Sequence, residues 1–310
     1  MTMAQPTLND TSDRYPTRTG GGGERLPRTD PAVWGHDVPG PVTAGDLRVY
    51  DEEGFLSLGQ VLTEEEIGRC LGEMNLLAAD PSLQHDPRLV REHRSGHVQS
   101  VYEVHTLSAF VAELVRRESI VGVARQILGS EVYVYQSRIN YKSGFVGGPF
   151  YWHSDFEVWH AEDGMPAPRA CSISIALTPN VLTNGGLMIM PGSHTSFVPC
   201  AGEIPADFAG SHKPELSDPP EEVLTRMAAE HDIKLLTGPA GSATVFDSNC
   251  MHGSNGNITP LPRSNLFFVF NSVHNTLAEP FAAEGRRPDF YGTRTVVPVK
   301  PNYPHQPIGR

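Results

Sequence analysis

The sequence has few cysteines, no long apolar run and no excess of basic residues. Only four of its 310 residues are cysteine, scattered at positions 70, 171, 200 and 250 without a Cys-x-x-Cys pair. This spacing excludes a disulfide framework and indicates reduced thiols in the cytoplasm. No segment approaches the roughly 18 apolar residues of a membrane-spanning helix, and the polar N-terminus lacks the apolar core of a signal peptide. We therefore expect a cytoplasmic protein with no membrane partner.

Acidic residues outnumber basic ones, 36 to 24, which gives a net charge of −12 at pH 7. A negative surface of this kind repels phosphate backbones, so we do not expect nucleic acid as a partner. The hydrophobic share of 39% is sufficient for a sizeable core. Residues 1–40 are rich in Pro, Gly and charge and are predicted to be mobile or draped over the surface. Residues 41–310 are predicted to form a single catalytic domain.

Helical signals are concentrated in the first half of the chain. Thr43 with Asp46, and Thr63 with Glu66, have the spacing of capping boxes, and Gly54 is placed to end the first helix. Apolar residues at helical spacing follow Thr63. A helical pair is predicted from about residue 108 to residue 128, before a glycine.

Strand signals dominate from residue 131 onward, separated by turns and without the βαβ rhythm of a parallel sheet. The pattern predicts a mainly β fold with flanking helices, an antiparallel jelly roll of the cupin type. A polar insertion at 200–235, with one helix near 221–230, has the length of a lid. The expected strands are 131–142, the stretch around His153, and 171–177, 186–190, 233–236, 242–247 and 266–273.

The sequence Phe150-Tyr-Trp-His-Ser-Asp contains a His-x-Asp pair, His153 and Asp155. In an extended segment these residues face the same side and can aim one nitrogen and one oxygen at a common point. With His252 as a distant third ligand they form the 2-His-1-carboxylate triad of non-haem iron oxygenases. Spacing alone leaves alternatives open. The pair is equally consistent with a His–Asp hydrogen bond at a sheet edge, and His160 is a rival third ligand.

The chain resembles the phytanoyl-CoA dioxygenase superfamily, and within it the branch that hydroxylates ectoine. The resemblance runs from about Arg14 to the Arg287-Pro288 region. It is carried by these segments: Gln136-Ser-Arg-Ile-Asn-Tyr-Lys142, Trp152-His-Ser-Asp-Phe-Glu157, Trp159-His160, Glu162-Asp-Gly-Met-Pro166, Met190-Pro-Gly-Ser-His194, Met251-His-Gly-Ser254 and Pro262-Arg-Ser-Asn-Leu-Phe267.

This resemblance implies a double-stranded β-helix, often a homodimer in this group. It implies Fe(II) held by His153, Asp155 and His252, with 2-oxoglutarate as co-substrate and O2 as oxidant. Three protein ligands leave three of the six positions around iron for the co-substrate and O2. The implied substrate is ectoine, a small zwitterionic cyclic amidine hydroxylated at ring carbon 5.

A 2-oxo acid with a second carboxylate needs a fixed cation for that distant carboxylate. Arg263 suits this role because a guanidinium binds a carboxylate through two hydrogen bonds. The resemblance adds Lys142 and Asn140 to the co-substrate site. Apolar walls such as Phe246 or Phe267 would strengthen the ion pairs by lowering the local dielectric constant.

A zwitterionic substrate needs an anion partner, a donor or cation partner and flat apolar walls. Glu157 is a candidate for the amidinium, and Trp159 is a candidate to cover the ring, with a cation–π contribution. Gln136 and Arg138 lie two residues apart and share a face of their strand. The resemblance implies that the glutamine contacts the substrate, and Arg138 is its candidate neighbour.

Two other functions remain consistent with the sequence. In the first, the same iron chemistry acts on a free amino acid such as proline. Alternatively, the chain is a non-catalytic jelly-roll module that binds a small solute or a structural metal. Zinc also accepts His and Asp ligands.

Overall fold

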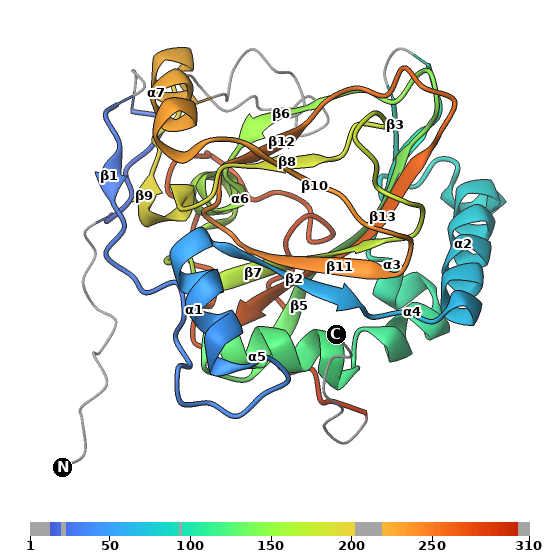
Figure 1. Ribbon diagram of the computed structural model, residues 1–310, viewed down its shortest axis with the longest axis horizontal. Coiled ribbons are helices and arrows are strands. Elements are labelled where there is room, and N and C mark those ends of the chain that lie inside the picture. Colours follow the sequence, from blue (N-terminus) through green and yellow to red (C-terminus); the bar gives the residue numbers. More distant parts are fainter. Residues whose placement is uncertain (1–12, 20–22, 93–94, 202–218, 303–310) are drawn as a thin grey trace.

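Two facing antiparallel sheets form the centre of the molecule in the computed structural model, which describes residues 13–19, 23–92, 95–201 and 219–302 (Figure 1). The larger sheet has seven strands in the order β2-β11-β7-β13-β5-β4-β3. Its strands are β2 (Phe55–Gln60), β11 (Ser242–Asp247), β7 (Ala170–Ala176), β13 (Arg263–Ser272), β5 (Val132–Lys142), β4 (Val98–Tyr102) and β3 (Leu89–Arg91).

The smaller sheet has four strands in the order β10-β8-β12-β6, and β1 pairs with β9 in a short separate ribbon. Phe246 and Phe267 of the larger sheet pack with Leu187 and Ile189 of the smaller one, which joins the two layers. The strands are β10 (Lys234–Leu236), β8 (Leu187–Ile189), β12 (His252–Ser254), β6 (Phe150–His153), β1 (Leu26–Pro27) and β9 (Ser196–Phe197). The mainly antiparallel fold predicted from the strand signals is thus confirmed.

Helix α1 begins and ends, and helix α2 begins, where the capping residues predicted. Thr43 and Asp46, and Thr63 and Glu66, form reciprocal capping boxes, and Gly54 closes α1 in a left-handed conformation at φ 78°. The helices are α1 (Ala44–Glu53), α2 (Glu64–Ala79), α3 (Val104–Leu107), α4 (Ala109–Leu114), α5 (Val123–Leu128), α6 (Asp155–Val158) and α7 (Glu221–His231). There are also two 3-10 helices, η1 (Pro81–Leu83) and η4 (Ser193–Thr195), and two π-helical segments, η2 (Glu118–Gly122) and η3 (Trp159–Asp163).

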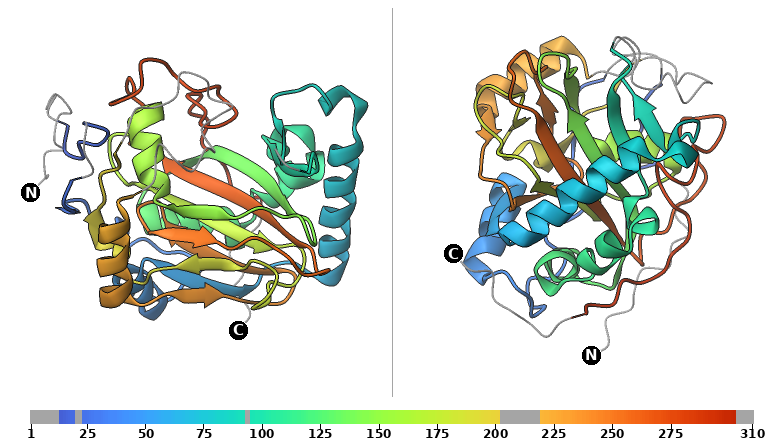
Figure 2. Two further views of the ribbon diagram at one scale, coloured as in Figure 1. Left: turned by 90° about the horizontal axis from the view of Figure 1, so that it is seen from above. Right: turned by 90° about the vertical axis from the view of Figure 1, so that its right-hand side faces the viewer.

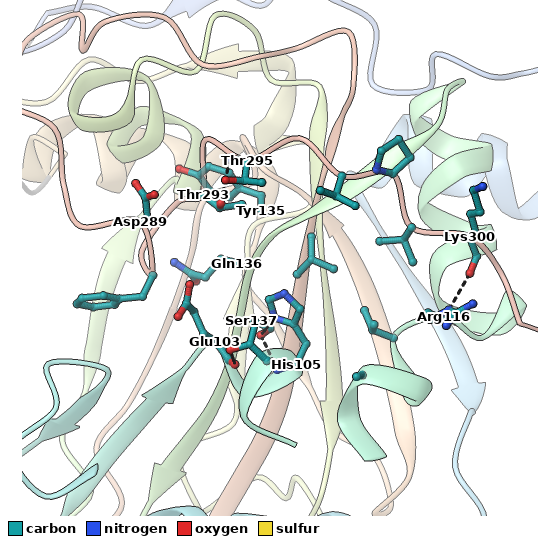
Figure 3. A pocket seen from close by; sticks show the side chains of 18 residues that line it. Glu103, His105, Arg116, Tyr135, Gln136, Ser137, Asp289, Thr293, Thr295 and Lys300 are labelled. Carbon is teal, nitrogen blue, oxygen red and sulfur yellow. Dashed lines mark hydrogen bonds between the residues drawn. The ribbon is translucent and has the colours of Figure 1, made fainter. Parts of the chain in front are cut away.

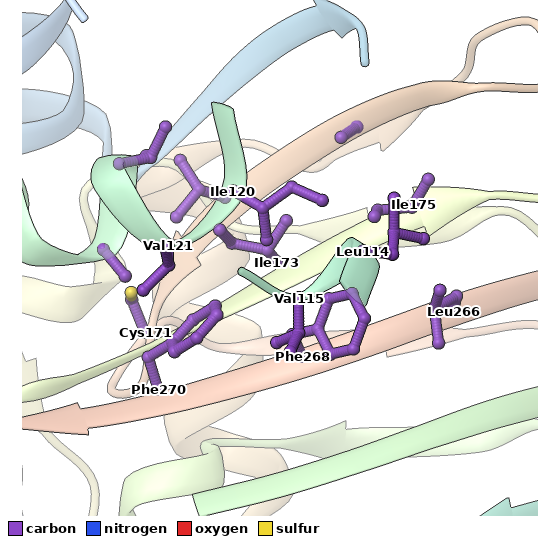
Figure 4. Close-up of a cluster of buried hydrophobic side chains, with 14 of the residues drawn as sticks. Leu114, Val115, Ile120, Val121, Cys171, Ile173, Ile175, Leu266, Phe268 and Phe270 are labelled. Carbon is purple, nitrogen blue, oxygen red and sulfur yellow. The ribbon is translucent and has the colours of Figure 1, made fainter. Parts of the chain in front are cut away.

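The main hydrophobic core lies between the larger sheet and the helices on its outer face (Figure 4). In β7, Ile173 and Ile175 enter this core, whereas Ser172 and Ser174 point to the opposite face. The core residues of α4, η2 and α5 pack against Phe268 and other side chains of β13. Figures 1 and 2 show α2 and α7 at opposite ends of the sheets. The strict alternation along β7 therefore separates a helix-covered apolar face from a polar inner face.

Part of the N-terminal segment, which the sequence predicts to be mobile or draped over the surface, is buried. Tyr15 and Thr17 are buried, and Tyr15 belongs to an aromatic cluster with Phe156 and Phe197. The free energy gained by burying the Tyr15 ring holds this segment against the protein despite its polar composition.

The predicted helix near 221–230 is confirmed as α7. Most of the predicted lid, residues 202–218, lies outside the described residues, and none of the described helices is long and apolar enough to cross a membrane.

We predict that Phe268→Ala lowers the free energy of unfolding by about 3–5 kcal/mol, because it leaves a cavity in the main core. Phe268 is fully buried. The matched control is Phe145→Ala, since that ring is 67% exposed and its loss should change the free energy by less than about 0.5 kcal/mol. Urea unfolding of both variants measures the difference. Equal effects would contradict the assignment of this core.

Candidate metal centre and co-substrate site

The chain changes from strand to helix at the His-x-Asp pair. His153 is the last residue of β6 and Asp155 is the first residue of α6. The expectation of one continuous extended segment is therefore wrong beyond residue 154. Ser154 caps α6, its hydroxyl accepting a hydrogen bond from the backbone N–H of Glu157. The Ser-x-x-Glu spacing of 154–157 was the available signal for this helix start.

Two imidazoles and one carboxylate converge at this turn. One ligand atom from each of His153, Asp155 and His252 lies within 4.8 Å of the others. Among the residues that the structure describes, they are the only such group of His, Cys, Asp and Glu side chains. His252 reaches the site because β12 pairs with β6 and sets it directly opposite His153. The ring centroids of the two histidines are 4.2 Å apart.

Neighbouring groups orient each of these three side chains. Nδ1 of His153 lies 2.7 Å from the Tyr151 carbonyl oxygen, and Nδ1 of His252 lies 3.0 Å from the Cys250 carbonyl oxygen. Both Nε2 atoms are thereby left for a metal, and Nε2 of His153 is 3.7 Å from Oδ1 of Asp155. The Ser172 hydroxyl donates to Oδ2 of Asp155 at 3.1 Å. Histidines held through the second nitrogen are typical of metal sites.

The electrostatics of His252 and Asp155 favour the protonation states that bind a cation. For His153, burial lowers the pKa, but the interaction with the Asp155 carboxylate outweighs it and raises the pKa above its ordinary value. Burial, followed by repulsion from His153, lowers the pKa of His252 to about 4, so its imidazole is neutral at pH 7. Burial alone would raise the pKa of Asp155, but the two histidines hold it well below its ordinary value. The donor set therefore fits a divalent metal such as Fe(II), with one face left open for other ligands.

A ladder of cross-strand pairs continues the site along the inner face of the larger sheet. The register of β5 with β13 pairs Lys142 with Arg263 and Asn140 with Asn265. Further along, Arg138 is opposite Phe267, and Gln136 is opposite Val269. Directly opposed residues of an antiparallel pair share one face. Their Cα pairing thus places the four residues predicted on β5 in one row, with two cations at one end.

The two cations are buried, and neither forms an ion pair with a described carboxylate. Lys142 donates to the Gly148 carbonyl, the Ser254 hydroxyl and the Asn255 carbonyl, at 2.8, 3.0 and 2.6 Å. Arg263 donates to the Gly185 carbonyl at 3.0 Å, while its Nε is buried with no hydrogen-bond partner. Burial lowers the pKa of Arg263 to about 10, and burial with repulsion from Arg263 lowers that of Lys142 to about 7. This pair fits the carboxylate of a dicarboxylic acid.

Hydrogen bonds and one cation–π contact hold the other three residues of the row. Asn140 accepts a hydrogen bond from Ser100, and Gln136 donates to the Tyr291 carbonyl at 2.6 Å. Arg138 donates to the Gln136 side chain and lies over the Phe267 ring, 4.8 Å from its centroid. Its positive charge also influences the pKa of Asp155 and His252, which places it near the metal ligands.

The structure does not place Glu157 and Trp159 on this inner face. Both carboxylate oxygens of Glu157 are bonded to Arg18, and one also to Thr17, so Glu157 is not available to a substrate in this arrangement. Trp159 is 3% exposed and packs edge-on against Tyr135. The sequence did not reveal the distant partners of Glu157, because Arg18 lies 139 residues away. His160, the rival ligand, is stacked on Phe281 away from the triad.

A cavity of about 600 Å³ lies beside β5 and is lined by residues of β5, of the α3–α4 region and of the C-terminal segment (Figure 3). Its lining includes His105 and Ser137, which are hydrogen-bonded at 2.6 Å, and the C-terminal residues 293–300. None of the three metal-site residues lines it. This cavity is therefore distinct from the three residues of the candidate metal centre, although Gln136 of the polar row is one of its lining residues.

Comparison with known proteins agrees with this geometry. Residues 50–265 match the family described as Phytanoyl-CoA dioxygenase (PhyH). The chain belongs to the phytanoyl-CoA dioxygenase family. Within this family, it is 56% identical over 300 residues to a protein of Streptomyces coelicolor named ectoine dioxygenase, covering 95% of this chain and 99% of that protein. It is 43% identical over 287 residues to the ectoine dioxygenase of Sphingopyxis alaskensis, covering 91% and 93%.

Solved structures of family members have the same fold. The crystal structure of EctD from S. alaskensis with 2-oxoglutarate and 5-hydroxyectoine superposes with a TM-score of 0.85 at 39% identity, covering 96% of this chain and 100% of that chain. The structure of EctD from S. alaskensis with bound Fe gives a TM-score of 0.84 at the same identity and coverage. The predicted cupin-like jelly roll is thereby confirmed.

Sequence reasoning missed several residues that complete the site. Ser172 supports Asp155, Ser254 supports Lys142, and Asn265 faces Asn140 across the strands. The alternation of Ser and Ile in β7 was the signal for Ser172, since the serines had to face away from the core. Asn265 follows Arg263 by two residues and so shares its face, which was also readable.

We predict that the protein binds one Fe(II) per chain and that His252→Ala weakens this binding by roughly a hundredfold or more, because losing a direct ligand exceeds the cost of losing a supporting one. Anaerobic titration followed by metal analysis after desalting measures this. The control is His97→Ala, because His97 is exposed and distant in sequence from the site. Unchanged affinity in His252→Ala would contradict the ligand set.

Proposed function

We propose that this protein is an Fe(II)- and 2-oxoglutarate-dependent dioxygenase that converts ectoine to 5-hydroxyectoine. The observation that carries the proposal is the inner face of the larger sheet. A group of three side chains that can bind a metal lies beside a row of polar side chains on this face. Two buried cations without carboxylate partners occupy the far end of the row. Relatives that share up to 56% identity over nearly the whole chain are named ectoine dioxygenase.

Each part of the site has a defined task in this reaction. His153, Asp155 and His252 hold the metal, and Ser172 keeps the Asp155 carboxylate in place. Arg263 and Lys142 bind the distant carboxylate of 2-oxoglutarate, with Asn140 beside them. Bound Fe(II), with 2-oxoglutarate and O2, supplies the oxidation that replaces a C–H bond of the substrate by C–OH and leaves succinate and CO2. The protein orients the C–H bond and excludes water.

Gln136 and Arg138 are the substrate-binding residues best supported by position. They lie on the same row as the cations, and Arg138 is close enough to the triad to influence its pKa values. Arg138 supplies a cation for the substrate carboxylate, and Phe267 beneath it supplies a flat apolar wall. Trp159 remains a predicted substrate contact that requires a different side-chain position. The homodimer and the cytoplasmic location inferred from the sequence stay predictions.

The decisive experiment is anaerobic reconstitution with Fe(II), followed by addition of O2, 2-oxoglutarate and one of several small solutes. We expect ectoine-dependent succinate release and 5-hydroxyectoine as the product. Asp155→Ala should abolish turnover, since it removes the only carboxylate of the metal site. Hydroxylation of free proline but not of ectoine would support the iron-dependent reaction but contradict the assignment of ectoine as the substrate. Metal binding without turnover of any solute would favour a non-catalytic binding module.

We predict that the KM for 2-oxoglutarate rises by about tenfold as the pH increases from about 6.5 to 8.5. The pKa of Lys142 is lowered to about 7, so the lysine is protonated below this pH and loses its positive charge above it. The protonated form binds the carboxylate, hence affinity falls as the pH rises. Lys142→Arg should flatten the profile, because arginine stays charged. The same slope in that variant would contradict the assignment.

A further inference from the structure

The N-terminal segment lies against the turn that carries Asp155. Oδ1 of Asp13 lies 2.9 Å from Nε2 of His160, and the Tyr15 ring meets Phe156 edge-on with centroids 5.1 Å apart. His160 and Phe156 belong to η3 and α6, which directly follow Ser154. A segment at the start of the chain thus covers the turn that begins with a metal-binding residue.

The strongest contact in this interface is a buried ion pair. Arg18 donates from Nε to Oε1 and from Nη2 to Oε2 of Glu157, both at 2.7 Å, and both side chains are only 2% exposed. The Thr17 hydroxyl adds a third hydrogen bond to Oε1 at 2.5 Å. Paired, hydrogen-bonded charges of this geometry are directional as well as strong. The Glu157 side chain is therefore held in one orientation.

Thr17 and Arg18 also form hydrogen bonds with the backbone of Cys200. The Thr17 hydroxyl accepts a hydrogen bond from the Cys200 backbone N–H at 3.0 Å, and the Arg18 backbone N–H donates to the Cys200 carbonyl at 3.2 Å. Arg18 has a φ of 59°, in the left-handed region that a residue with a Cβ rarely adopts. Such a conformation persists where surrounding contacts hold it. Thr17 and Arg18 thus join α6 to a distant part of the chain.

These contacts bear on Asp155 because the helical segment that it begins is short. Helix α6 spans Asp155–Val158 and continues directly into η3, which ends at Asp163. Together they are shorter than the roughly 12–15 residues that an isolated helix needs to be stable. The position of α6 depends on bonds from outside: the Ser154 cap, the bond from the Phe156 N–H to the Ser248 carbonyl at 2.7 Å, and the ion pair at Glu157. Glu157 is two residues from Asp155, so displacement of its side chain would turn the helix start.

We propose that Thr17 and Arg18 are positioning residues of the metal site, which act through Glu157 to fix the carboxylate of Asp155 toward the two histidines. The N-terminal segment is then part of the active-site scaffold rather than a surface extension. The inference rests on the proposed function in one respect, since it takes Asp155 as a ligand of Fe(II).

The test is the dissociation constant for Fe(II), measured anaerobically on the full chain. The main variant is the double substitution Arg18→Leu with Glu157→Leu, because removing both charges leaves no unpaired charge in the interior. We expect its affinity for Fe(II) to fall about tenfold, as when a supporting residue of a metal site is lost. Thr17→Val, a milder change that keeps the ion pair, should show a smaller loss, and so should Arg18→Lys, which keeps the charge but not the two-pronged geometry.

Two controls separate positioning from general destabilisation. Arg14→Ala removes a neighbouring arginine whose side chain is 45% exposed, and it should leave Fe(II) affinity unchanged. Val121→Ala weakens the main core on the far side of the larger sheet (Figure 4). It should lower the thermal unfolding temperature without changing Fe(II) affinity.

The possible results have distinct meanings. Wild-type Fe(II) affinity in the double variant, or in Thr17→Val and Arg18→Lys if the double variant does not fold, would overturn the positioning role. So would an equal loss of affinity in Val121→Ala. If the unaltered protein binds Fe(II) and hydroxylates ectoine, such a result leaves the proposed function intact. If the unaltered protein binds no Fe(II), the proposed function itself fails.

Discussion

Two positive charges buried side by side on the inner face of a sheet constrain the rest of the site. Lys142 and Arg263 are 3% exposed, face one another across β5 and β13, and repel each other. Removing a cation from water costs several kcal/mol unless other groups compensate. Lys142 has three oxygen acceptors, whereas Arg263 has one acceptor and a buried Nε without a partner. A dicarboxylate bound between them would relieve both the repulsion and the desolvation.

The sheet holds these charges in place because its other face is anchored by an apolar core. Leu266 and Phe268 of β13 alternate with Asn265 and Phe267, and the first two enter the core beneath the helices. Strands held on one face by close packing form a rigid base for side chains on the other. The polar row on β5 therefore takes its spacing from the register of β5 with β13, whereas the three residues of the candidate metal centre lie on β6, α6 and β12.

Segments from both ends of the chain complete the site around this base. The N-terminal Thr17 and Arg18 hold Glu157 beside the metal-binding turn. Near the C-terminus, the Tyr291 carbonyl accepts from Gln136, and Arg287 forms a buried ion pair with Asp163. The first contact involves β5 and the second involves η3. Glu162 and Asp163 thus pair with Arg287 in the scaffold, whereas His153, Asp155 and His252 form the candidate metal centre.

The sequence by itself determined most of the helices and strands, the capping residues of α1 and α2, and the alternation that separates core from site in β7, but not the change from strand to helix at Asp155. These follow from local rules: side-chain spacing along a helix or strand, and the few residues that satisfy free backbone groups. Only the tertiary structure decided that residue 252 meets residues 153 and 155, that Glu157 faces Arg18 instead of the inner face, and that Trp159 packs against Tyr135. Those contacts depend on strand register and on partners that are distant in the sequence, up to 139 residues away for Arg18 and Glu157, which no local pattern encodes.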